Sequence, residues 1–265
     1  MKKFGILVLF ISSQLIFAQA NRFVYQVTMK LDSTNRNDIK TETANLDVSA
    51  EKSIFYGEKR LQRDSLFKRA SETKTFNFDR SQMENLRSNI DFVVEKDSKT
   101  GNKNFKSRIA RDNYIYTEDR AMDWKILPET AKIGDYKTQK AETNFAGRTW
   151  FAWFTSDVPI QDGPYKFSGL PGLIVKVEDS KGDFSFDLKE AKKINAIASF
   201  EDRGSTITLK RKDFEKQLQK FKQDPSSAMT PNRGGNRNQP TPQERKDREN
   251  RMKEEALKNN NSIEK

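Results

Sequence analysis

Apolar and polar residues alternate along much of this chain, and a period of two is typical of half-buried β-strands. The pattern is clearest at 173–178, where Leu173, Val175 and Val177 fall on one face of an extended chain. A polar turn separates this segment from a second alternating run at 184–188, so the two predict a β-hairpin. Further extended segments are expected at 23–31, 43–55 (one strand or two), 90–95, 104–109, 114–117, 132–141, 142–145, 150–155, 194–199 and 206–210.

Two segments show the spacing of helices instead. The charged segment 59–73 carries a moderate helical pattern, and 214–222 places Phe214 and Leu218 on one face behind Asp213, a candidate N-cap. Many short strands with few helices between them favour a mainly β fold. We expect a curved antiparallel sheet or a partly open, half-barrel-like barrel with a few short helices.

The two ends of the chain differ from this β-rich middle. A basic start, an apolar run over 4–17 and the small residues Ala18 and Ala20 predict a secretory signal peptide over 1–20, cleaved after either alanine. Prolines, Asn, Gln and then a charged run predict a disordered tail over 223–265, with transient helix near 242–257. The remainder, 21–222, is expected to form one domain that is periplasmic or secreted.

Composition excludes several kinds of chemistry. The chain has no histidine and no cysteine, so catalytic triads, haem ligation by histidine and the usual zinc sites are not available to it. Disulfides and lipid attachment through cysteine are excluded too. We expect no cofactor and no metal. The net charge of +11 suits anionic envelope surfaces, but mixed charges that keep a β-protein soluble are the simpler explanation, and export argues against nucleic acid.

The stretch 163–174 has the strongest local constraints. Its glycines permit positive φ and close backbone approach, while its prolines fix φ and remove a donor. The stretch predicts a corner in an extended chain rather than a reactive site. No phosphate loop is expected, because no Lys-Ser/Thr pair follows and a strand comes next. The residues of this structural signature are Gly163, Pro164, Gly169, Leu170, Pro171, Gly172, Leu173 and Ile174.

Residues 169–174 spell a motif that is similar to the one that names the GLPGLI family of exported Bacteroidetes proteins. The aromatic run 150–155, the Gly-Pro-Tyr turn at 163–167 and the segments 124–126 and 133–137 also resemble that family's pattern. Many members of that family carry a cysteine near the position of Tyr136, which this chain lacks. The resemblance supports export and the fold, and it implies no activity because none is assigned to the family.

Aromatic side chains are the candidate ligand contacts. Rigid rings line clefts and interfaces, although core packing is the simpler role for them. Trp150 and Trp153 fall on opposite faces of one strand, so one of them needs a second apolar layer or a ligand. We expect one of these two, together with Tyr165 and Phe167, to line the concave side of the sheet.

Three functions fit these observations. The first is an exported, non-enzymatic binding or accessory protein that holds an apolar ligand, a peptide or a partner segment on the curved sheet. The second is a carboxylate-dependent hydrolase, which needs two facing acids, one with a raised pKa. The third is an accessory subunit that docks on an outer-membrane receptor through the basic tail. The acids nearest the signature, for which turn-forming roles are the alternative, are Asp157, Asp162, Glu178, Asp179 and Asp183.

Overall fold

The computed structural model describes residues 20–110, 112–200, 205–224 and 241–265. The expected signal peptide lies outside these residues except for Ala20. The strands in the described ranges are β1 (Ala20–Met29), β2 (Lys40–Val48), β3 (Lys52–Gly57), β4 (Phe92–Asp97), β5 (Lys103–Ile109), β6 (Asp112–Thr117), β7 (Lys125–Ile133), β8 (Tyr136–Phe145), β9 (Arg148–Thr155), β10 (Leu173–Asp179), β11 (Phe184–Ile194) and β12 (Thr206–Thr208). The helices are α1 (Glu58–Thr73), α2 (Arg80–Asn85), α3 (Arg211–Gln223) and α4 (Pro242–Lys258).

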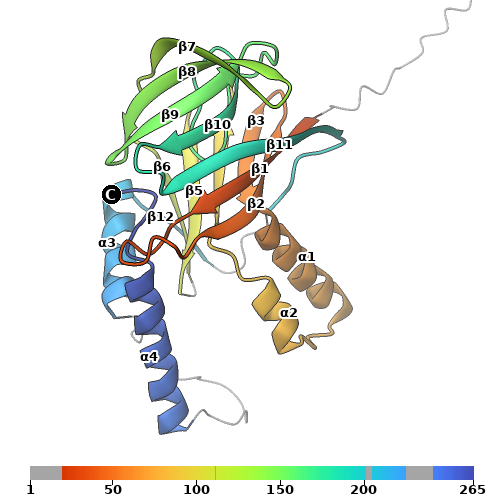
Figure 1. Cartoon of the computed structure of the whole chain (residues 1–265). Helices are drawn as coiled ribbons and strands as arrows, with labels where there is room; N and C mark the ends of the chain where they lie inside the picture. Colours follow the sequence, from red (N-terminus) through yellow and green to blue (C-terminus); the bar gives the residue numbers. More distant parts are fainter. Residues whose placement is uncertain (1–19, 111, 201–204, 225–240) are drawn as a thin grey trace, which may run out of the picture.

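All strands of the described part form one curved sheet in the order β12-β6-β5-β4-β3-β2-β1-β11-β10-β9-β8-β7 (Figure 1). Two antiparallel meanders, β1 to β6 and β7 to β11, are joined where β1 pairs with β11. β12 pairs with β6 in parallel. Because β7 and β12 are the two edges, the sheet stays open, and the expected mainly β, partly open architecture is confirmed.

The two faces of the sheet are buried to different extents. The inner face carries the main core, built from residues such as Tyr25, Leu46 and Phe186. The outer face carries a small cluster of Ile54, Tyr56 and Val93. Helix α1 packs beside β2 and β3, whereas α3 packs beside β5, β6 and α4 (Figure 1). The inner face therefore holds most of the core, and α3 covers the part of it that lies over β5 and β6.

Several local predictions need correction. Residues 195–200 form no strand, since the Ala198 amide donates to buried Asp47 at 2.8 Å on the outer face. The expected segment 132–141 is divided by a turn at Gly134, whose φ is +57°. Helix α3 begins at Arg211, so Asp213 is not the N-cap and lies in the first turn, where a negative charge still favours the helix dipole.

Of the tail expected over 223–265, residues 225–240 lie outside the described part, and helix α4 coincides with the helix expected near 242–257. Helix α4 starts with a capping box in which the Glu244 amide donates to the Thr241 hydroxyl at 3.2 Å. After α4 comes the closing segment, residues 259–265, which returns to the sheet. The Asn261 amide donates to the Leu31 carbonyl at 2.8 Å, and the Lys265 amide donates to the Ala146 carbonyl at 2.8 Å. These long-range hydrogen bonds give the segment a fixed position that its composition alone does not reveal.

Candidate functional site

The signature forms the loop between β9 and β10 and begins the latter strand. The Phe167 amide donates to the Pro164 carbonyl at 3.1 Å, which closes a tight turn with Tyr165 at φ +54°. A bulky residue at positive φ is a true outlier. At Gly172, φ is +149° and an added Cβ would lie 2.0 Å from the Thr155 carbonyl oxygen. The stretch is a corner, as expected, and only glycine fits its last turn.

A buried lysine fastens this loop to the distant strand β4. The Lys96 ammonium contacts the Asp162 carboxylate and donates to the carbonyls of Gly163 at 2.6 Å and Phe167 at 3.4 Å. Burial lowers the pKa of Lys96, and the attraction of Asp162 opposes that effect. The Trp124 indole adds a hydrogen bond of 2.9 Å to the Ser168 carbonyl. The loop is thereby held over the inner face by partners outside its own sequence.

The predicted aromatic residues do not all meet at one site. Trp150 is buried and packs on Phe167 with ring centroids 4.8 Å apart, so these two rings belong to the core. Trp153 is half-buried on the other side of β9, with its ring 5.7 Å from the Lys140 ammonium. Tyr165 alone among the four lines the cavity described next. Trp150 and Phe167 lie in the core of the inner face but do not line that cavity, so their role as ligand contacts stays a prediction.

A cavity of about 750 Å³ lies on the inner face, between the sheet, α3 and the closing segment. Such a volume falls within the roughly 300–1,000 Å³ of pockets that hold small molecules. Aliphatic groups contributed by β1 include Val27 and Met29. The aromatic lining consists mainly of Phe92, Phe105, Tyr116, Tyr165, Phe186 and Phe214.

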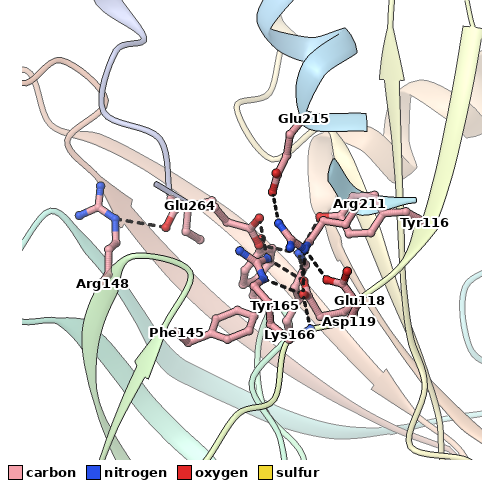
Figure 2. Close-up of polar contacts among 12 residues, drawn as sticks. Tyr116, Glu118, Asp119, Phe145, Arg148, Tyr165, Lys166, Arg211, Glu215 and Glu264 are labelled. Atoms are coloured by element: carbon pink, nitrogen blue, oxygen red, sulfur yellow. Dashed lines mark hydrogen bonds and ion pairs between the residues drawn. The ribbon is translucent and has the colours of Figure 1, made fainter. Parts of the chain in front are cut away.

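A buried ionic cluster borders one end of the cavity (Figure 2). The fully buried Lys166 ammonium donates to the Tyr116 hydroxyl at 2.7 Å, the Glu118 carboxylate at 2.7 Å and the Glu264 carboxylate at 2.5 Å. Arg120 binds Glu118 with two hydrogen bonds of 2.7 and 2.8 Å and reaches Glu264 at 2.9 Å. Two cations and two carboxylates from three distant parts of the chain thus neutralise one another, with Lys166 and Glu118 buried and Arg120 and Glu264 partly exposed.

The protonation states in this cluster follow from these contacts. Burial opposes ionisation of Glu118, but hydrogen bonds and charges from Arg120 and Lys166 outweigh it and lower the pKa of Glu118 to about 2. The same balance lowers the pKa of Glu264. Burial raises the pKa of Tyr165 well above its usual range, so its hydroxyl stays protonated and donates to Glu264. Both carboxylates therefore act as acceptors at neutral pH.

Another buried cation, Arg148, holds the closing segment in place. Its guanidinium contacts Asp179 at 2.7 Å and Asp183 at 3.1 Å. The same group donates to the Asn261 side chain and the Ser262 carbonyl, both at 2.6 Å. The β10–β11 turn and the closing segment are thus tied to one arginine at the start of β9.

The acids singled out in the sequence are not arranged as a catalytic pair. Asp157 is exposed, and Glu178 pairs with Lys176 at 3.0 Å near the surface. Asp162, Asp179 and Asp183 are buried, and each contacts a cation. Burial opposes the ionisation of Asp183, but hydrogen bonds from Asn261 and Arg148 lower its pKa, whereas an acid catalyst needs a raised one. Across the residues that the structure describes, no three acidic side chains are placed to hold a metal ion.

The most distinctive polar groups were not predicted as site residues. Lys166 had a signal in the sequence, because it interrupts the apolar part of the signature. Arg148 also had a signal, because it is a charged residue directly before the aromatic run 150–155. No feature of the sequence pointed to Glu118, Arg120 or Glu264, because charged residues in loops and tails usually face water.

Comparison with known proteins gives a local match to one family and a similar fold. The model of a family described as "Protein of unknown function (Porph_ging)" matches residues 144–176. This match covers β9, the signature loop and part of β10, which is also the stretch that resembles the GLPGLI family; that finer naming stays a prediction. No curated protein sequence matches the chain.

Two crystal forms of PNGF-II share the fold. Their structures, in space groups P21 and C2, match with TM-scores of 0.54 and 0.53 at 18% sequence identity. Each match covers 77% of this chain and 34% of the PNGF-II chain, so this chain spans about a third of that protein's length. At this identity the likeness concerns the fold alone.

Within the described segments, no helix combines the length and the apolar character needed to cross a bilayer.

Proposed function

We propose that this protein is an exported, non-enzymatic binding protein of the cell envelope that holds an apolar ligand in the cavity on its inner face. One observation carries the proposal, namely the cavity of about 750 Å³ lined mainly by aromatic and aliphatic side chains. Apolar surface left without protein partners gains free energy when a ligand removes it from water. Export to the cell envelope is also part of the proposal, and it is supported by the signal peptide predicted over residues 1–20.

The walls of the cavity also support a role in ligand binding. Its sheet side is well packed, because Phe105 stacks on both Phe92 and Tyr116 with centroids 5.2 and 5.1 Å apart. Its lid side is formed by α3 through Phe214 and by the closing segment through Ile263. A preformed wall and a lid from separate segments are features of sites that admit a ligand without refolding.

A cavity-filling substitution tests the proposal. Ser107 lines the cavity from β5, whereas its neighbour Arg108 is exposed on the other face of the strand. Ser107→Phe should lower the affinity for an environment-sensitive apolar dye at least about tenfold, equivalent to about 1.4 kcal/mol. Arg108→Phe, the matched control, should leave the affinity within about twofold.

The readout is dye fluorescence in a titration of the purified protein. Equal affinities for Ser107→Phe, Arg108→Phe and the unmodified protein would place the dye elsewhere and refute the cavity as the binding site. Tryptophan emission is a poor reporter, because none of the lining side chains is a tryptophan.

A further inference from the structure

The polar end of the cavity has the geometry of a carboxylate receptor. Glu264 lines the cavity, and its carboxylate accepts from the Tyr165 hydroxyl, from Lys166 at 2.5 Å and from Arg120 at 2.9 Å. These donors come from the signature loop and from the segment after β6, whereas the acceptor comes from the closing segment. Figure 2 shows the side chains of Tyr165, Lys166 and Glu264 gathered at one point.

The charges at this point favour an anion. Without Glu264, the fully buried Lys166 and the partly exposed Arg120 would share one carboxylate partner, that of Glu118, which Arg211 also approaches at 3.7 Å. A buried ammonium that shares its carboxylate with two arginines is poorly compensated, which is unfavourable. A carboxylate in the place of Glu264 therefore pairs with both Lys166 and Arg120.

Glu264 is the member of this group that a ligand would displace. It belongs to the closing segment, which backbone hydrogen bonds of Asn261 and Lys265 tie to the rest of the protein on either side of it. Its own side chain is 16% exposed, whereas that of Lys166 is 0% exposed. If the Glu264 side chain turns away while these backbone bonds persist, Lys166 and Arg120 face the cavity directly.

We propose, resting on the binding function above, that the ligand is an amphiphile with one terminal carboxylate, a fatty acid. Its hydrocarbon chain lies against the aromatic wall, and its carboxylate takes the place of Glu264 between Tyr165, Lys166 and Arg120. Glu264 is then an internal competitor for the ligand. A neutral amphiphile can fill the apolar part of the cavity but cannot take the place of Glu264 between the cations.

The test compares dodecanoic acid with dodecan-1-ol on the unmodified protein and on Glu264→Gln. Both titrations displace the apolar dye, and thermal unfolding with each ligand gives an independent readout. Since Gln removes the competing charge and keeps the side chain's shape, the acid should bind Glu264→Gln at least about tenfold more tightly than the unmodified protein. The acid should also raise the unfolding temperature of Glu264→Gln more than that of the unmodified protein. The alcohol should bind both proteins within about twofold.

Two outcomes overturn the inference, and they differ in what they leave standing. If the alcohol binds but the acid gains nothing on Glu264→Gln, the carboxylate receptor is wrong and the binding function survives. If neither amphiphile displaces the dye from either protein, both proposals fail.

A second variant covers the case in which Glu264→Gln does not fold. Glu264→Ala removes the competing carboxylate and leaves room for water beside the cations, so the acid should bind at least about tenfold more tightly while the alcohol stays within about twofold. Equal gains for acid and alcohol would show that the variant only enlarges the cavity, and would count against the receptor.

Discussion

The inner face of the sheet has a packed half and a hollow half. In the packed half, over β8 to β10, the signature loop fills the space with Phe167 and Leu170. In the hollow half, over β1, β4 to β6 and β11, the cavity remains and is closed by α3 and the closing segment. The loop that fills the first half connects adjacent strands, whereas Glu264 in the second lies 99 residues from its partner Tyr165. Closure by a short loop costs less entropy than closure by a long one, so the hollow half is the more costly of the two to close.

The packed half should be the least tolerant of change. Gly172→Ala brings a Cβ to 2.0 Å from the Thr155 carbonyl oxygen, a backbone atom that cannot easily move. We expect a loss of about 4 kcal/mol or more in the free energy of unfolding, measured by urea denaturation. Gly169→Ala is the matched control, because its φ is +93° but no atom lies within 4 Å of the added Cβ, and it should lose about 1–2 kcal/mol. Similar losses of unfolding free energy for both variants would show that the loop backbone moves to make room for a Cβ at position 172.

The buried ionic cluster, where the two halves meet, depends on the charge of Lys166. Lys166→Met leaves Glu118 and Glu264 buried with one cation fewer, and removing one partner of a buried pair typically costs about 3–5 kcal/mol. Lys176→Met removes a lysine whose partner, Glu178, is 37% exposed, and should cost at most about 1 kcal/mol. Chemical denaturation at pH 7 gives both values. A loss for Lys166→Met as small as the control's would mean that water reaches the cluster freely.

Acid should weaken the same cluster. The pKa of Glu118 is lowered from 4.5 to about 2 in the folded protein, so its contribution is present above about pH 4.5 and is lost as the pH falls toward 2. We expect the unmodified protein to exceed Glu118→Gln in unfolding free energy by roughly 2–3 kcal/mol at pH 6. This difference should shrink steadily between pH 4.5 and 2. A difference that does not vary with pH would assign the effect to packing instead of charge.

The smallest expected effect is a gain in stability at Lys103 on β5. Burial and the nearby charge of Lys96 lower the pKa of Lys103 to about 8, so its protonated form is disfavoured by folding. Since that penalty applies below the folded pKa, Lys103→Met should stabilise the protein by about 1 kcal/mol at pH 7, after allowance for solvent screening. The gain should vanish as the pH rises from 8 to 10.5. Thermal unfolding across this range measures it, and a loss of stability at pH 7 would contradict the assignment.

Much of the fold was predictable because alternation is a local property. The hairpin of β10 and β11 and the corner at Gly172 follow from residue types within a few positions of each other. The missing strand at 194–199 was not predictable, because its backbone is bound by Asp47, about 150 residues away in the sequence. The cavity was expected in kind, on the concave side, but its lining aromatic residues come mainly from β4 to β6, β11 and α3.

By itself, the sequence determined the β-rich class, the corner between β9 and β10 and the absence of histidine and thiol chemistry. These depend on each residue's own conformational range and chemistry. The tertiary structure decided that Lys166 would be buried, that Glu264 from a charged tail would neutralise it, and that half of the inner face would stay hollow. A charge can be buried only where folding brings an opposite charge to it, and no pattern along the chain specifies which distant residue that will be.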